Sequence, residues 1–327
     1  MSTARARRHR RSREAALTVT VLFAAKPESW ADYAAPLRAA FAEEGLDAAL
    51  VTEAAPETVD YIVYAPSSGL EDFHPFTRLK AVLNLWAGVE DVVGNPTLTV
   101  PLARMVDDAG LTQGMVEWVT GHVLRHHLGM DRHILGQDGV WRRGAPPLAT
   151  ERRVTILGLG ALGAACGQAL ARLGFPVTGW SRSPKRIEGI DARSGADGLA
   201  AALARADILV LLLPLTTETE NLVDAARLAE LPEGAVLINP GRGALIDDTA
   251  LLAALDAGHL AHATLDVFRT EPLPPEHPFW AHPKVTVTPH IASETRPASA
   301  ARVIAANIRR AEAGAPLHHL VDRARGY

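Results

Sequence analysis

Arg242, Glu271 and His290 are the side chains of this sequence whose combination indicates chemistry. Each comes within a few residues of the end of a short apolar run that predicts a β-strand. The carboxyl ends of parallel strands meet at one edge of an open α/β sheet, so we expect the three side chains to share a site. Arg242 could bind the carboxylate and carbonyl oxygens of a 2-oxo acid through two parallel hydrogen bonds. His290 could protonate the carbonyl oxygen as a hydride reaches the carbon, while Glu271 orients the imidazole and favours its charged form.

A glycine-rich turn predicts where a dinucleotide that supplies hydride would bind. Gly158, Gly160 and Gly163 follow the strand-like run VTIL and open a helical run. The first glycine permits a tight turn, the second lets a pyrophosphate approach the backbone, and the third lets the helix pack close to the strand. Free N–H groups at the head of this helix, which includes Ala161 and Leu162, would face the phosphates.

The strand after this helix ends without the acidic residue that binds the ribose of NAD. The acid's place falls at Ser181, and Arg182, Ser183 and Lys185 follow it. An acid would repel a 2′-phosphate, whereas hydroxyl groups and cations can bind one. The sequence therefore predicts NADP(H), with NADPH preferred over NADH. The alternative is that Arg182 and Lys185 are ordinary surface charges.

Strand-like and helical runs alternate along the chain, which predicts parallel α/β sheets. The chain length of 327 residues suits about two domains. A first strand series is expected at 17–23, 48–51, 61–64, 81–85 and 98–100, and a second at 154–157, 177–180, 208–212, 235–238, 263–267 and 285–288. Long helices are expected at 30–44, 111–128 and 298–313. Because the last helix follows a complete second series, we expect the C-terminus to return to the first domain.

Composition indicates a globular protein of the cytoplasm. The formal net charge of -4 argues against general binding to nucleic acid, and no apolar run is long enough to span a membrane. The single cysteine, Cys166, excludes an intramolecular disulfide and is expected to be a small packed residue. The arginine-rich segment 1–16 is interpreted as a disordered, solvated tail, with a targeting or nucleic-acid-binding arm as the alternative. His122 and His126 have a spacing that could bind a metal, but no glutamate completes a metal motif, so no metal is predicted.

Several motifs together resemble one enzyme family. The glycine turn, the Arg-Gly loop at Arg242, the segment DVFRTEPLP and the TPH ending at His290 occur in the order found in D-isomer-specific 2-hydroxyacid dehydrogenases. The strand end WSRS, the tripeptide TRP and the closing VDRARGY are similar to the glyoxylate/hydroxypyruvate reductase A type in particular. The resemblance runs from about residue 17 to residue 327.

The resemblance implies roles for individual residues. Arg242, Glu271 and His290 would be the catalytic residues, and Asp266 would face the nicotinamide end of the cofactor. Leu213 and Pro214 would line the cofactor, and backbone N–H groups of Trp86, Ala87 and Gly88 would bind the substrate carboxylate. A small residue is usual where Trp86 stands, so the indole could narrow the pocket.

The resemblance also implies a fold and an activity. Two Rossmann-like doubly wound domains would enclose the active site in the cleft between them: a flavodoxin-like substrate domain of residues 17–100 and 291–327, and a dinucleotide-binding domain of residues 101–290. The enzyme would reduce small 2-oxo acids, glyoxylate and hydroxypyruvate first, and would form a homodimer through the dinucleotide-binding domain. The alternatives are a dehydrogenase for a bulkier D-2-hydroxy acid, an NAD-linked enzyme, or a nucleotide-sensing protein of the same fold.

Overall fold

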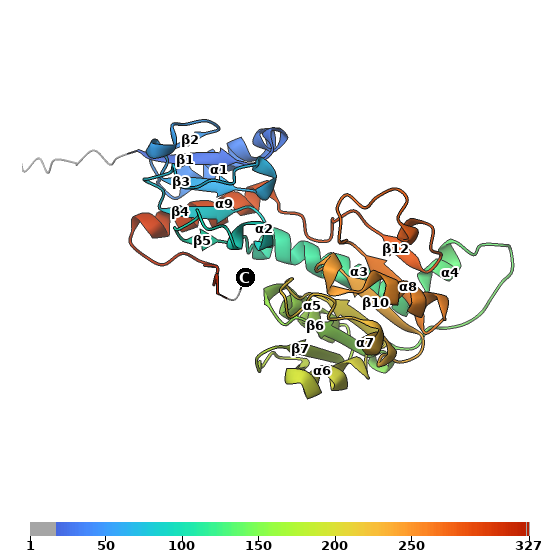
Figure 1. Ribbon diagram of the computed structural model, residues 1–327. Helices are drawn as coiled ribbons and strands as arrows, with labels where there is room; N and C mark the ends of the chain where they lie inside the picture. The colour runs from blue at the N-terminus through green and yellow to red at the C-terminus, as the bar shows by residue number, and fades with distance from the viewer. Residues whose placement is uncertain (1–17, 325, 327) are drawn as a thin grey trace, which may run out of the picture. The chain divides into compact units, whose positions relative to one another are not determined.

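The computed structural model describes residues 18–324 and residue 326 (Figure 1). The chain divides into two compact units. The first runs to Met105 and takes up the C-terminal segment Ala300–Val321, and the second spans Val106–Ser299 together with the last residues. The division into functional domains at residues 100 and 290 stays a prediction. The arginine-rich segment 1–16 lies outside the described residues. No helix of the described residues is long and apolar enough to cross a bilayer.

The first unit is built on a parallel sheet of five strands in the order β2-β1-β3-β4-β5. This is the order of flavodoxin-like folds. Its strands are β1 (Val19–Ala24), β2 (Ala48–Val51), β3 (Tyr61–Tyr64), β4 (Ala81–Asn84) and β5 (Leu102–Ala103), and its helices are α1 (Trp30–Glu43), α2 (Glu90–Val93) and most of α9 (Pro297–Glu312).

Packing of α9 explains why the C-terminal segment belongs to the first unit. Apolar residues of α9 recur at helical spacing and are buried, among them Ile304 and Ile308. At the end of the helix, Glu312 accepts a hydrogen bond of 2.5 Å from the Tyr61 hydroxyl and lies 2.6 Å from Lys80 Nζ. The chain therefore returns to the sheet that it began, as the sequence predicts.

The second unit is built on a parallel sheet of seven strands in the order β12-β11-β10-β9-β6-β7-β8. Chain order reverses between β6 and β9, the switch point at which Rossmann folds bind their ligands. Its strands are β6 (Val154–Leu157), β7 (Val177–Ser181), β8 (Ile190–Ser194), β9 (Ile208–Leu211), β10 (Ala235–Asn239), β11 (Leu260–Leu265) and β12 (Val285–Val287). Its helices are α3 (Gln113–His127), α4 (Met130–Ile134), α5 (Ala161–Arg172), α6 (Gly195–Leu203), α7 (Ala225–Ala229) and α8 (Asp248–Asp256).

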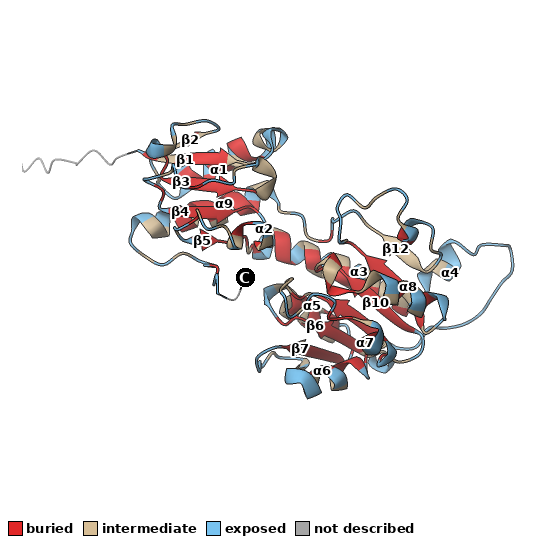
Figure 2. Cartoon of the chain, in the orientation of Figure 1, coloured by how far each residue is buried: buried red, intermediate tan, exposed pale blue. Residues whose placement is uncertain are grey.

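The core of each unit lies along its strands, which are largely buried (Figure 2). β6 and β9 are buried at every position, as expected for central strands of a parallel sheet. Helix α3 places Met115, Val119 and Val123 against Cys166 and Leu170 of α5. Burial raises the pKa of the Cys166 thiol to about 12, so this cysteine is a packed residue, as predicted.

The predicted α/β fold with two parallel sheets is confirmed, with two corrections. A strand at 98–100 was predicted wrongly: the pairing with β4 comes later, at Leu102, because Pro101 has no N–H to donate and contributes only its carbonyl, which accepts from Val82. The strand β8 was not predicted, because its sequence IDARS contains no apolar run. An edge strand that pairs only with β7 does not need one.

Candidate active site

His290 and Glu271 form a hydrogen-bonded pair in the second unit. His290 follows β12 and Glu271 follows β11, and His290 Nδ1 lies 2.6 Å from Glu271 Oε2. The hydrogen bond that His290 makes to Glu271 outweighs burial and raises the pKa of His290. Burial would raise the pKa of Glu271, but hydrogen bonds from His290 and from the Phe268 N–H lower it instead. Each group of the pair therefore favours the charged form of the other.

Asp266 fixes the backbone that carries His290. This aspartate is completely buried, and its carboxylate accepts from Thr288 Oγ1 at 2.6 Å and from the N–H groups of Ile291 at 3.0 Å and Ala292 at 2.8 Å. His290 itself has a φ of 54° and donates its N–H to the Asp266 carbonyl at 2.8 Å. A positive φ is uncommon for a residue with a side chain and is kept only where neighbours enforce it. Asp266 was predicted to face the nicotinamide, and this role stays a prediction.

Arg242 lies close enough to act on this pair through its charge. Its guanidinium favours ionisation of Glu271 and, taken alone, disfavours a positive charge on His290. Gly243 allows this approach, since a Cβ there would lie 2.0 Å from the carbonyl carbon of Phe268. Asn239 shapes the loop by donating to the Arg242 carbonyl and accepting from the Gly241 N–H. The structure thus brings the three predicted catalytic side chains together. Asn239 was missed, although its place at the end of a buried strand could have indicated it.

The glycine turn has the geometry of a phosphate-binding loop. Gly158 has a φ of 108°, and a Cβ there would lie 2.4 Å from the Leu212 carbonyl oxygen. A Cβ on Gly163 would lie 1.8 Å from the Gly158 oxygen, whereas one on Gly160 would meet no atom within 4 Å. Space is therefore kept open at the one glycine that a pyrophosphate would approach. Ala161 and Leu162 open α5 directly behind it.

The residues predicted to bind a 2′-phosphate occupy different surroundings after β7. Ser181 is buried and donates its hydroxyl hydrogen to the Ser183 carbonyl at 2.8 Å. Arg182 is half-exposed and lies 3.1 Å from Glu218. Lys185 Nζ donates to the Leu159 carbonyl at 2.6 Å, inside the glycine turn.

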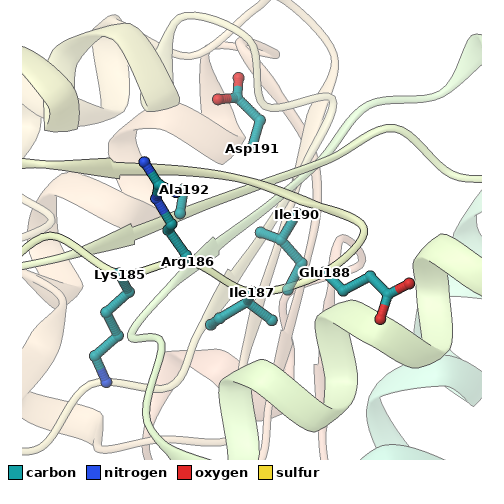
Figure 3. A pocket seen from close by; sticks show the side chains of 7 residues that line it. All are labelled: Lys185, Arg186, Ile187, Glu188, Ile190, Asp191 and Ala192. Carbon is teal, nitrogen blue, oxygen red and sulfur yellow. The ribbon is translucent and has the colours of Figure 1, made fainter.

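A shallow hollow on the β7–β8 connection begins at Lys185 but does not include Ser181, Arg182 or Ser183. In Figure 3 the side chains of Lys185 and Arg186 point in opposite directions. This hollow therefore does not mark the predicted phosphate site. Lys185 serves the glycine turn in this structure, and its contact with a 2′-phosphate stays a prediction.

The loop after β9 presents the other predicted cofactor residues. Leu213 is buried, and the Pro214 carbonyl accepts from Thr219 Oγ1 at 2.7 Å, which closes the loop into a turn. The same turn carries Glu218, the partner of Arg182. The sequence did not indicate Glu218 as a site residue, because no motif in the surrounding residues distinguishes it.

The Trp86–Gly88 turn belongs to the first unit and directly follows β4. The indole of Trp86 is partly exposed, and the turn lies between β4 and α2, outside both elements. Its predicted role is to bind a substrate carboxylate through backbone N–H groups.

His126 of α3 and His262 of β11 each have a threonine hydroxyl as a hydrogen-bond partner. His126 Nε2 lies 2.8 Å from Thr264 Oγ1, and His262 Nε2 lies 2.8 Å from Thr286 Oγ1. Burial lowers the pKa of His126 to about 3 and that of His262 to about 4, so both are neutral. Among the residues that the structure describes, no group of three His, Cys, Asp or Glu side chains is placed to hold a metal ion.

The chain matches known proteins over most of its length. Residues 120–292 match the family model for the NAD-binding domain of D-isomer-specific 2-hydroxyacid dehydrogenases. The chain is 44% identical over 258 residues to a glyoxylate/hydroxypyruvate reductase A of Serratia proteamaculans, which covers 76% of this chain and 82% of that relative.

Solved structures agree with this match. A D-isomer-specific 2-hydroxyacid dehydrogenase from Xanthobacter autotrophicus Py2, in complex with NADPH and MES, aligns with a TM-score of 0.88 at 44% identity, over 95% of this chain and 100% of that one. An NADPH-dependent glyoxylate/hydroxypyruvate reductase from Sinorhizobium meliloti, in complex with NADP and sulfate, aligns with a TM-score of 0.82 at 39% identity, over 95% of this chain and 99% of that one.

The fold and the site therefore define a two-unit, dinucleotide-dependent oxidoreductase. This chain belongs to the D-isomer-specific 2-hydroxyacid dehydrogenase family, which confirms the resemblance that its motifs indicate.

Replacing single glycines of the turn should separate folding from cofactor binding. Gly163→Ala should lower the melting temperature strongly, because the new Cβ would overlap the Gly158 oxygen. Gly160→Ala should leave the melting temperature within a few degrees and weaken NADPH binding about tenfold or more, since only the approach of a pyrophosphate is obstructed. Circular dichroism and cofactor titration measure the two effects. Equal loss of stability in both variants would contradict the assignment.

Glu271→Gln should shift the pH dependence of reduction. Because the hydrogen bond to the Glu271 carboxylate raises the pKa of His290, loss of that carboxylate should lower the pKa. The protonated imidazole is then lost at lower pH, so the alkaline limb of the pH–rate profile should move to lower pH. Glu276→Gln, an exposed change in the same loop, is the matched control and should leave the profile in place. An unchanged profile for Glu271→Gln would refute the pairing.

Proposed function

We propose that this protein reduces small 2-oxo acids with NADPH as the hydride donor, glyoxylate and hydroxypyruvate being the leading substrates. The observation that carries this proposal is the grouping of His290, Glu271 and Arg242 in a unit with a dinucleotide-binding turn. Relatives that share 39–44% of their residues with this chain include named glyoxylate/hydroxypyruvate reductases and a structure with NADPH bound. NADPH, when bound, supplies the hydride.

Each catalytic side chain has one task in this mechanism. Arg242 binds the substrate carboxylate and carbonyl oxygen through its fork of N–H groups and polarises the carbonyl. His290, held protonated by Glu271, gives the proton of Nε2 to the carbonyl oxygen as the carbon is reduced. In the reverse direction the neutral imidazole takes the proton from the hydroxyl. Glu271 stays ionised throughout and keeps the ring in one orientation.

The proposed preference for NADPH depends on the end of β7. Ser181 stands where an acid would repel a 2′-phosphate, and Arg182 offers a guanidinium that is half-exposed and therefore accessible. Ser183 and Lys185 complete the predicted contacts, and the Leu213–Pro214 loop with Asp266 lines the cofactor elsewhere. A hydroxyl and a cation at the strand end, where NAD-binding folds carry an acid, favour NADP over NAD.

We assign the first unit to the substrate and the second to the dinucleotide, which corresponds to the predicted domains of residues 17–100 with 291–327 and of residues 101–290. From the end of α4 to the start of β6 the second unit exposes large apolar side chains, which is unusual for a monomer's surface. They are Ile134, Leu135, Val140, Trp141 and Leu148, with Trp141 91% exposed. We propose that a second copy covers them in a homodimer, which the molar mass in solution tests. The reduced, buried Cys166 suits a cytoplasmic protein.

His290→Gln tests the proposed activity against the sensing alternative. Loss of a general acid should lower kcat for glyoxylate by about 10²–10⁴-fold. NADPH binding should stay nearly unchanged, because glutamine removes the proton donor and not the nucleotide site. A substrate panel with both cofactors, run on the unaltered protein, separates glyoxylate and hydroxypyruvate from bulkier 2-oxo acids. A reductase rate that survives this substitution would rule the mechanism out.

Ser181→Asp combined with Arg182→Leu should move cofactor preference toward NADH. The new carboxylate repels a 2′-phosphate and can accept from a ribose hydroxyl, while the guanidinium is lost. We expect the ratio of kcat/KM for NADPH over NADH to fall by about tenfold or more, equivalent to about 1.4 kcal/mol. Arg186→Leu is the matched control, because Arg186 points away from Lys185 in Figure 3. A double variant with unchanged preference would show that Arg182 is an ordinary surface charge.

A further inference from the structure

Strand β4 ends on a polar residue in an apolar setting. Asn84 is 1% exposed and follows the buried residues of Ala81–Leu83. A buried asparagine must find partners for its amide or lose stability. Here the partners lie immediately ahead in the chain, in the Trp86–Gly88 turn.

Both N–H groups of the Asn84 side chain are used within that turn. Nδ2 donates to the Trp86 carbonyl at 2.9 Å and to the Gly88 carbonyl at 2.8 Å. The Met105 N–H, just past β5, donates to the same Trp86 carbonyl at 3.0 Å. Two carbonyls two residues apart are thus tied to one buried amide at the strand end.

Fixing these carbonyls leaves the amides of the turn available. Within the described part of the chain, the N–H groups of Trp86, Ala87 and Gly88 donate to no acceptor. All three residues are at least partly accessible to solvent. Successive N–H groups of a turn can bind an anion when they have no internal partners. The arrangement therefore suits one carboxylate that meets more than one amide.

The Oδ1 atom of Asn84 shows that this residue lowers the stability of the fold. Oδ1 is buried and has no hydrogen-bond partner among the described residues. An unpaired buried acceptor destabilises a fold, so an apolar side chain would serve β4 better if only packing mattered. The two donors must therefore contribute something that packing does not need.

We propose that Asn84 is the positioning residue of the substrate site: it holds the Trp86–Gly88 turn so that its amides bind the carboxylate of the 2-oxo acid. This inference rests on the proposed function, since it names what orients the carboxylate-binding turn of that same site. Asn84 does not touch the substrate. It acts through the two carbonyls that it binds.

The test compares Asn84→Leu, which is close in size and lacks donors, with the unaltered full-length protein. We expect KM for glyoxylate to rise about tenfold or more while kcat changes less, the pattern of lost ground-state binding. The inhibition constant of oxamate, a non-reacting analogue with the same carboxylate, should rise in parallel. The dissociation constant of NADPH should stay within about twofold, a result that general damage to the fold would not give.

Asn95→Ala is the matched control. Asn95 also donates to a loop carbonyl of the first unit, that of Glu71 at 2.7 Å, and not to a carbonyl of the Trp86–Gly88 turn. The KM and oxamate inhibition of this variant should therefore match those of the unaltered protein. Asn84→Ser keeps one hydrogen-bond donor and replaces Asn84→Leu as the test variant if the leucine variant does not fold. It should weaken oxamate binding by several-fold. A folded Asn84 variant that binds oxamate as tightly as the unaltered protein would overturn the inference.

Failure of the proposed function gives a different result. If the unaltered protein reduces no 2-oxo acid yet binds oxamate, measured by quenching of its tryptophan fluorescence, the Asn84 comparison is still decided by oxamate affinity. If the unaltered protein binds neither glyoxylate nor oxamate in the presence of NADPH, the inference is wrong together with the function.

Discussion

The buried carboxylate of Asp266 is the constraint on which the rest of the active site depends. Its oxygens accept from one hydroxyl and two backbone N–H groups, all from residues that follow β12. A carboxylate without solvent needs such partners, because removal of a charge from water is otherwise very costly. The segment after β12 therefore cannot take another path. Within that segment His290 accepts an unfavourable φ and meets Glu271.

Close backbone contacts position the other parts of the second unit. Gly243 lets the Arg242 loop approach Phe268, and Gly158 and Gly163 let the phosphate turn close against β9 and α5. These are contacts between main-chain atoms, so no side chain can adjust to relieve an added Cβ. Loops held by such main-chain contacts have less conformational freedom to lose when a dinucleotide binds. The glycine spacing in the sequence thus reflects the positions at which main-chain atoms of two loops approach each other.

Sequence patterns predicted most of this fold because apolar runs and glycines report packing directly. The central strands and the long helices were found, and Arg242, Glu271 and His290 do come together. What the sequence did not reveal depends on contacts at long sequence separation. The polar edge strand β8 has no apolar signal, and the surroundings of Lys185 follow from a bond to Leu159, 26 residues away. Asn84 and Asn239 were missed because a polar residue at a strand end gives no sign of which carbonyl it will bind.

Asn84, Asn239 and Asp266 solve the same physical problem in three places. Parallel strands end at one edge of a sheet, and the chain that leaves each strand has main-chain groups without ladder partners. A buried amide or carboxylate at the strand end binds those groups and decides which way the loop faces. Asn84 donates to two carbonyls, Asp266 accepts from two N–H groups, and Asn239 does one of each. The kind of polar side chain at each strand end thus determines which main-chain groups remain for a ligand. Asn84 binds carbonyl groups and leaves N–H groups, which suit an anion. Asp266 binds the N–H groups, so at that strand end the His290 side chain does the chemistry.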